Sequence, residues 1–141
     1  MDRQSSGWAP FFLRLALGAI FLARGVQKFL TQGTTGVGSD LSGMGFPMAD
    51  ILAIALIVIE VVGGLFLTIG LLTRIMGIFL AVTMAVSLFV VHLPHGFFLP
   101  GGIEFHLLLT LASFSLVFSG AGNLSLDVLF FGRKQPAAAE N

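Results

Sequence analysis

The sequence predicts an all-α fold, a transmembrane four-helix bundle with a short C-terminal interfacial helix. Of the 141 residues, 56% are hydrophobic and only 10% are charged, whereas a soluble domain carries roughly 25% charged residues. The mean hydropathy is +1.00, and so small a domain cannot hide that much apolar surface in its own core. The apolar runs are continuous rather than alternating, which favours helices over strands.

Four apolar segments approach the length of a bilayer-spanning helix, which needs about 20 residues. Proline suits a first helical turn, so the first span is expected to begin around Trp8 or Pro10. Glu60 alone interrupts the second span, Thr73 and Arg74 form the turn before the third, and glycines end the fourth, which is the shortest. We expect one membrane domain over residues 1–134, with spans at about 9–30, 50–72, 74–92 and 103–120.

The segments between and after the spans have the composition of loops and of an interfacial segment. Residues 31–47 are rich in Gly, Thr and Ser and are expected to form an external loop. Residues 93–102 contain two prolines and three glycines, so this loop cannot be helical throughout. Residues 123–132 place Asp127 among leucines and phenylalanines, which predicts an interfacial helix, and residues 135–141 are expected to form a mobile tail.

The distribution of cationic residues predicts the orientation in the cell membrane. An even number of spans places both termini on one side, and Lys and Arg concentrate on the cytoplasmic side of multi-pass proteins. Only Arg24 and Lys28 belong to the other side. Both termini are therefore expected to be cytoplasmic, because the cations on their side are Arg3, Arg14, Arg74, Arg133 and Lys134.

Several function classes are disfavoured. The net charge is zero and no basic stripe is present, so nucleic acid is not an expected partner. The chain contains no cysteine, which excludes thiolate chemistry and iron–sulfur clusters, and any redox chemistry must belong to a bound cofactor or a partner. His92, His95, Glu104 and His106 resemble a loose metal-binding set. Histidines beside Pro and Gly are more often bonded to loop carbonyls or water, and we predict no metal site.

Glu60 is the most informative single residue. A carboxylate near the bilayer centre costs about 2.5 to 3.5 kcal/mol, so it needs a partner or a proton. Arg24 lies about two turns into the first span from the same outer end, which makes a buried Glu60–Arg24 pair plausible. Such a pair could be a structural contact that sets helix register, or the polar floor of a ligand site.

Polar side chains from all four spans gather at this outer end. Phe97, Phe98 and Phe105 lie near them in the sequence, and aromatic walls beside a few polar groups suit a flat, partly apolar ligand such as a quinone. Glu60 and His92 are the candidates for a catalytic role as proton carriers. The predicted ligand-binding residues are Arg24, Gln27, Lys28, Glu60, His92, His95, Glu104 and His106.

The order and spacing of several short motifs resemble the DoxX family of small membrane proteins. The resemblance extends from Arg14 to Asp127 and includes Arg14-Leu-Ala-Leu-Gly18, Gly25-Val-Gln-Lys28, Gly45-Phe-Pro47, Glu60-Val-Val-Gly-Gly64, Gly70-Leu-Leu-Thr-Arg74, His92-Leu-Pro-His-Gly-Phe-Phe98, Glu104, Gly120-Ala-Gly122 and Ser125-Leu-Asp127.

The resemblance implies a four-helix membrane fold and a link to redox biology. Some family members are the small membrane subunit of a thiosulfate:quinone oxidoreductase, and others are associated with complexes that contain superoxide dismutase and a sulfurtransferase. This sequence has Arg24 where family members often carry a histidine before the glycine of the first span. A role that needs a neutral base at that position is therefore in doubt here, whereas binding of an anion or a carbonyl oxygen is not.

Two functions fit these observations. The first is a redox-associated accessory subunit of an oxidoreductase that binds a quinone or similar small carbonyl compound in an outward-facing polar pocket. The alternative is a non-catalytic membrane scaffold that recruits soluble oxidative-stress enzymes. A small transporter is disfavoured, because four spans without an inverted repeat give little room for alternating access. Membrane lipid, protein partners in a redox complex and a further copy of the chain are the expected partners.

Overall fold

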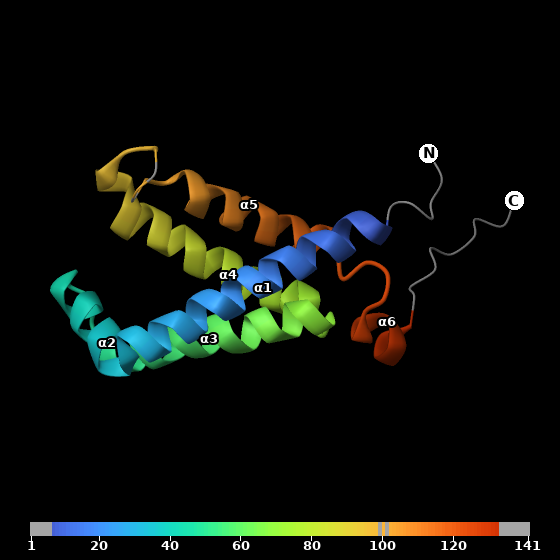
Figure 1. Cartoon of the computed structure of the whole chain (residues 1–141), viewed down its shortest axis with the longest axis horizontal. Helices are drawn as coiled ribbons and strands as arrows, with labels where there is room; N and C mark the ends of the chain where they lie inside the picture. The colour runs from blue at the N-terminus through green and yellow to red at the C-terminus, as the bar shows by residue number, and fades with distance from the viewer. Residues whose placement is uncertain (1–6, 99, 101, 133–141) are drawn as a thin grey trace, which may run out of the picture.

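A computed structural model of the chain describes residues 7–98, 100 and 102–132 (Figure 1). Every regular element in these residues is helical, so the all-α prediction is confirmed for the described part of the chain. The predicted mobile tail at 135–141, together with Arg3, Arg133 and Lys134, lies outside the described residues. The elements are α1 (Trp8–Thr31), α2 (Gly33–Gly43), α3 (Ala49–Ile69), α4 (Thr73–Ser87), a π-helical turn (Leu88–His92), a 3-10 turn (Leu93–His95), α5 (Glu104–Ser119) and α6 (Leu126–Phe131).

Three helical segments are long and apolar enough to cross a bilayer. They are α1, α3 and the continuous helical stretch Thr73–His95, with mean hydropathies of 1.6, 2.6 and 2.3. Helix α5 is apolar but has only 16 residues, fewer than the roughly 20 that span hydrocarbon without adjustment. The chain is therefore a helical protein with membrane-type helices, and the fourth span remains a prediction.

The long helices form two antiparallel pairs. Figure 1 shows α1 beside α3 and α4 beside α5, with the two pairs close together near α6 and apart near α2. Glycine permits the close approach within the first pair, because a Cβ atom on Gly64 would lie 2.5 Å from the backbone nitrogen of Leu22. This approach brings the polar residues of α1 and α3 within reach of each other.

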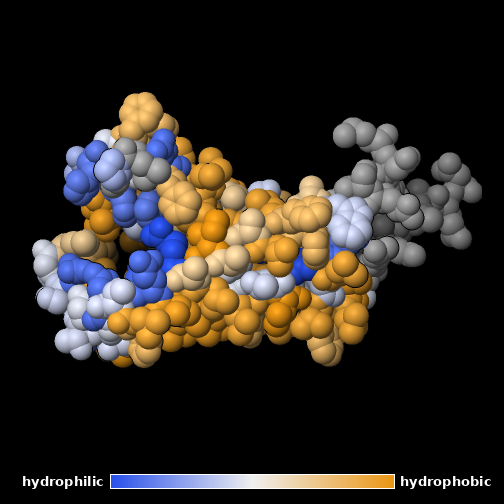
Figure 2. Space-filling view, viewed as in Figure 1, coloured by the Kyte–Doolittle hydropathy of each residue, from blue (hydrophilic) through white to orange (hydrophobic). Residues whose placement is uncertain are grey.

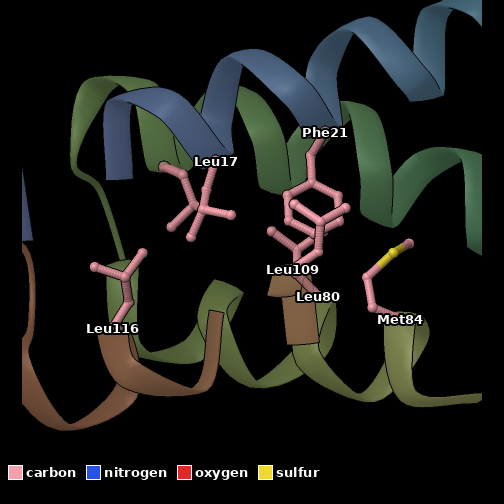
Figure 3. Packing of buried hydrophobic residues seen from close by; sticks show 7 residues of the cluster. Leu17, Phe21, Leu80, Met84, Leu109 and Leu116 are labelled. Atoms are coloured by element: carbon pink, nitrogen blue, oxygen red, sulfur yellow. The ribbon is translucent and has the colours of Figure 1, made fainter. Parts of the chain in front are cut away.

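One apolar core lies between the two pairs. Figure 3 shows labelled side chains from α1, α4 and α5 that point toward one another, and Leu67 of α3 belongs to the same cluster. Phe21, Leu80 and Leu116 are fully buried. The complete cluster contains Leu17, Phe21, Leu67, Leu80, Met84, Leu109 and Leu116.

The outer surface of the long helices is also apolar. Figure 2 shows hydrophobic residues along the middle of the molecule and hydrophilic residues gathered at the α2 end. Val58, Phe79 and Leu111 expose 50%, 49% and 60% of their surfaces. Soluble monomers rarely expose an apolar patch larger than a few hundred Å², so this belt indicates contact with lipid.

Helix α2 corrects the prediction of an unstructured loop at 31–47. Its residues include several glycines and hydroxyl side chains, which favour loops when considered alone. However, Val37 is buried against Ala53 and Ile57 of α3, and Leu41 packs on the same cluster. Tertiary packing of this apolar stripe outweighs the weak helix propensity of the segment.

The turn between α3 and α4 also differs from the prediction. It lies at Gly70–Leu72 rather than at Thr73 and Arg74, and α4 already begins at Thr73. Gly70 has a φ of 74°, the left-handed conformation that glycine adopts readily at a helix C-terminus. The predicted second span, which ends at 72, therefore extends past the end of α3 at Ile69, whereas the predicted third span, which begins at 74, starts one residue after the start of α4.

Candidate functional site

A cavity of about 360 Å³ lies at the α2 end, between the α1–α3 pair and α4. A hollow is visible at this end in Figure 2, with hydrophilic residues on its rim. Its volume is within the range of small-ligand pockets. The polar side chains that line it are Arg24, Lys28, Gln32, Asp40, Glu60, Thr83, Ser87 and His92, and most of the remaining wall is aliphatic.

Glu60 forms an ion pair at the floor of the cavity. Its Oε1 atom accepts a hydrogen bond of 2.6 Å from Lys28 Nζ. The Glu60 side chain is completely buried, while that of Lys28 is 26% exposed. The buried carboxylate thus has a cationic partner from α1, but the partner is Lys28 and not Arg24, one helical turn away.

Arg24 instead contacts a histidine of α5. Its Nη2 lies 3.2 Å from His106 Nε2, and its guanidinium carbon lies 5.6 Å from the centre of the Phe105 ring. Because a guanidinium can only donate, His106 Nε2 accepts and the ring hydrogen of a neutral His106 is on Nδ1. Arg24 therefore selects one tautomer of His106.

His92 completes the group from the end of α4. Its ring stacks on that of His106 with the centroids 3.6 Å apart. His92 Nδ1 donates to the carbonyl oxygen of Ser87 at 3.0 Å. The residue ends the π-helical turn Leu88–His92, and single π-turns often occur at functional sites. The widened turn holds His92 against α5.

The structure brings together five of the eight predicted ligand-binding residues, namely Arg24, Lys28, Glu60, His92 and His106. The first four of these line the cavity, whereas His106 contacts Arg24 and His92 without lining it, and the other three do not line it either. Gln27 faces away on the exposed side of α1, and His95 is exposed with its Nδ1 bonded to the carbonyl of Val91. Glu104 lies at the first turn of α5, outside the cavity lining.

The aromatic wall expected from the sequence is wrong, because none of its three members lines the cavity. Phe97 and Phe98 are 49% and 75% exposed and do not line the cavity. Phe105 packs against the apolar core and lies beside the Arg24 guanidinium. The wall consists instead of side chains such as Leu56, Ile59 and Val86, with Phe46 near the α2 end.

No group of three or more His, Asp or Glu side chains in the described residues lies close enough together to hold a metal ion. His92 and His106 are stacked face to face. His92 Nδ1 is bonded to Ser87 and His106 Nε2 to Arg24. The nitrogens that remain do not form a ligand set with a carboxylate.

A second polar cluster, which sequence reasoning did not identify, lies at the opposite end of the molecule. Arg14 of α1 is 1% exposed, and all five of its N–H groups donate to carbonyl oxygens. The acceptors are in the last turn of α3 and in the segment that follows α5, namely Leu67, Thr68, Ala121, Asn123 and Leu124. A cation at these carbonyls also complements the negative end of the α3 dipole.

Asp127 of α6 completes this second cluster. Its two carboxylate oxygens accept from the backbone N–H groups of Leu72 and Thr73, at 2.7 and 2.9 Å. These are the first N–H groups of α4, which has no cap from its own side chains. Asp127 therefore caps α4 from a distant part of the chain, and α6 is fastened to the α3–α4 turn.

Comparison with known proteins assigns the chain to a family. The family model described as DoxX matches residues 9–93. The chain is 35% identical over 123 residues to a Bacillus subtilis (strain 168) protein named "Putative oxidoreductase CatD", with 87% of each chain covered. It is 36% identical over 124 residues to an uncharacterized protein of Haemophilus influenzae, covering 85% of this chain and 89% of the relative. No solved structure matches it.

The family match includes α1, α3 and α4, which supply residues to both polar clusters. It does not include α5 or the segment after it, which supply the others. The relatives extend the similarity over most of the chain. Together with the helical fold and the apolar belt, these matches show that the chain belongs to the DoxX family of membrane proteins.

Proposed function

We propose that this protein binds a quinone or similar small carbonyl compound in the cavity at the α2 end, as an accessory subunit of a membrane oxidoreductase. The observation that carries the proposal is a group of four ionisable side chains from α1, α3 and the end of the α4 segment, with His106 beside them, in a cavity whose remaining wall is mostly aliphatic. Arg24, Lys28, Glu60 and His92 line it, and His106 supports Arg24 and His92 from α5. A few polar groups in an apolar pocket suit a ligand with an oxygenated head and an apolar body.

The charged residues have separate roles in this proposal. The nitrogens of Arg24 and Lys28 donate hydrogen bonds, which is what a carbonyl oxygen can accept. Glu60 and His92 are the groups that can take up or release a proton beside the ligand. The chain has no cysteine, so the electrons belong to the bound compound or to a partner subunit. The name of the Bacillus relative supports this redox association.

The apolar wall offers access from the hydrocarbon. Val82 and Val86 of α4 and Leu52 of α3 line the cavity, yet they expose 57%, 44% and 39% of their surfaces. In a bilayer these surfaces contact lipid. A lipophilic compound can therefore reach the polar floor between α3 and α4 without crossing the polar rim.

The proposal includes a four-span arrangement in the cell membrane with both termini in the cytoplasm. Helix α5 runs antiparallel to α4, and its 16 residues give a length of about 24 Å. Local thinning of the bilayer can accommodate this shorter segment. Arg14 contacts the carbonyl of Ala121 and Arg74 lies beside Gly120, so both cations are at the end of the bundle where α5 ends, which supports the cytoplasmic assignment. The cavity then opens at the outer leaflet.

Quinone binding to the full chain in lipid nanodiscs tests the proposal. We expect saturable binding of a short-chain benzoquinone to the unaltered protein and its loss in Arg24→Met. Arg74→Met is the matched control, because Arg74 is an exposed arginine at the start of α4 and away from the cavity. Equal binding by the two variants, or no saturable binding by the unaltered protein, contradicts the proposal.

The scaffold alternative is supported by a different surface. Leu129, Phe130 and Phe131 of α6 are at least 69% exposed, so they can contact lipid or a soluble partner. Replacing Leu129 and Phe130 by serine leaves Asp127 in place and preserves the cap on α4. A scaffold loses its partners in affinity purification of this double variant, whereas quinone binding at the other end is unaffected.

A further inference from the structure

Three buried polar atoms near the cavity have no hydrogen-bond partner among the described residues. They are Arg24 Nε, Glu60 Oε2 and His106 Nδ1, one atom each from α1, α3 and α5. Buried polar atoms in native proteins are almost always paired with protein or with a bound molecule. Arg24 and Glu60 line the cavity, and Glu60 is completely buried. The two atoms that belong to lining residues, Arg24 Nε and Glu60 Oε2, therefore indicate what a bound molecule has to supply, while His106 is not itself a lining residue.

The three atoms differ in hydrogen-bond character. Arg24 Nε can only donate, and His106 Nδ1 carries the ring hydrogen because Nε2 faces the Arg24 guanidinium. Glu60 is ionised beside the Lys28 ammonium, with Oε1 occupied at 2.6 Å. Its Oε2 atom has lone pairs only. The unpaired set is thus two N–H donors and one carboxylate acceptor.

A quinone and its quinol differ in how they match this set. The carbonyl oxygens of a quinone accept hydrogen bonds but donate none, so a bound quinone leaves Glu60 Oε2 unpaired and places lone pairs beside it. Each hydroxyl of a quinol donates one hydrogen bond and accepts others. A hydroxyl can therefore donate to Glu60 Oε2 while its oxygen accepts from a neighbouring N–H group.

We propose that the cavity binds the reduced, dihydroxy form of its ligand more tightly than the quinone, with one hydroxyl donating to Glu60 Oε2. This inference rests on the proposed function and specifies the ligand form. A bound quinol gains a hydrogen bond to the charged Glu60 carboxylate, whereas a bound quinone leaves that acceptor unpaired. This difference corresponds to a roughly tenfold to hundredfold difference in affinity. A tenfold preference raises the two-electron potential of the bound couple by about 30 mV.

The test compares both forms of one compound on the full chain in nanodiscs. The probes are a decyl-substituted benzoquinone and its quinol, the latter kept reduced by dithionite under anaerobic conditions. We expect the quinol to bind the unaltered protein at least about tenfold more tightly. Equal or tighter binding of the quinone overturns this inference but leaves the proposed function intact, whereas no binding of either form overturns the proposed function.

Glu60→Gln sharpens the test because it converts the unpaired acceptor into a donor. The amide oxygen can still accept from Lys28, and the amide NH₂ then occupies the place of Oε2. We expect the preference for the quinol to fall by about tenfold or to reverse in favour of the quinone. Asp50→Asn is the matched control, since it makes the same acid-to-amide change at an exposed position in the first turn of α3.

Size-exclusion profiles and melting curves in detergent show whether Glu60→Gln retains the fold. If this variant does not fold, the affinity ratio of the unaltered protein decides the question by itself. A folded Glu60→Gln protein that keeps the full preference for the quinol contradicts the role assigned to Oε2.

Discussion

The two polar clusters at opposite ends of the bundle are built in opposite ways. At the α6 end, Arg14 uses all five of its donors and Asp127 uses both carboxylate oxygens, every one of them on backbone groups. At the α2 end, the charged side chains contact one another, and three of their buried atoms have no partner among the described residues. The charged groups of Arg14 and Asp127 are thus saturated, whereas those of Arg24 and Glu60 are not.

This difference separates a structural role from a binding role. A saturated cluster of charged and backbone groups rigidifies the fold and has nothing left to offer a ligand. An unsaturated cluster beside a cavity is costly for the protein alone and becomes favourable when a molecule completes its hydrogen bonds. A charged residue in a membrane segment is therefore not sufficient to indicate a ligand site, and the state of its hydrogen bonds distinguishes the two cases.

The largest effect is expected when the saturated cluster is broken. Arg14→Met leaves the carbonyl groups of two chain segments, the last turn of α3 and the segment after α5, without their shared donor. Removing one member of such a buried charged network typically costs about 3 to 5 kcal/mol. We expect a lower melting temperature in detergent or failure to recover folded protein, with Arg74→Met unchanged. A stability equal to that of the control means that Arg14 does not hold this end together.

Replacing the Lys28–Glu60 ion pair at the α2 end should change the stability in the opposite direction. We expect the double variant Lys28→Met and Glu60→Leu to fold with unchanged or higher stability, because apolar residues in place of a buried pair are often neutral or stabilising by about 1 to 4 kcal/mol. The same variant should bind no quinone. Melting curves and ligand titration on one preparation measure both effects, and a marked loss of stability would show that the pair is structural.

Removing the Asp127 cap at the start of α4 should lower the stability by an intermediate amount. Asp127→Ala removes the acceptor for the N–H groups of Leu72 and Thr73, and loss of a helix cap costs about 0.5 to 2 kcal/mol. Proteolysis near α6 should become faster, while quinone affinity at the far end stays constant. A change in affinity without a change in proteolysis contradicts the separation of the two clusters.

The smallest effect is expected at two positions that the sequence included in the site. Gln27 and His95 are exposed and do not line the cavity. We expect Gln27→Ala and His95→Ala to leave quinone affinity and stability within about 0.5 kcal/mol of the unaltered protein. Loss of binding in either variant, measured by the same titration, requires the site to extend beyond the cavity described above.

Much of the fold was accessible from the sequence, because the apolar runs identify the long helices. The predicted spans at 9–30 and 103–120 differ from α1 and α5 by about one residue at each end. Helix α2 was missed, because its helix depends on burial of Val37 against α3 and not on local propensity. The sequence also grouped four residues that line the cavity, Arg24, Lys28, Glu60 and His92, but it named four others that do not.

The sequence alone determined that the chain is helical, apolar on its outer surface and unable to leave Glu60 without a partner. Only the tertiary structure decided that the partner is Lys28, since Arg24 and Lys28 share one face of α1 and the axial position of α3 selects between them. Only the tertiary structure revealed the role of Arg14, because its acceptors are backbone carbonyls. Every residue carries such a carbonyl, and folding determines which of them meet a buried arginine.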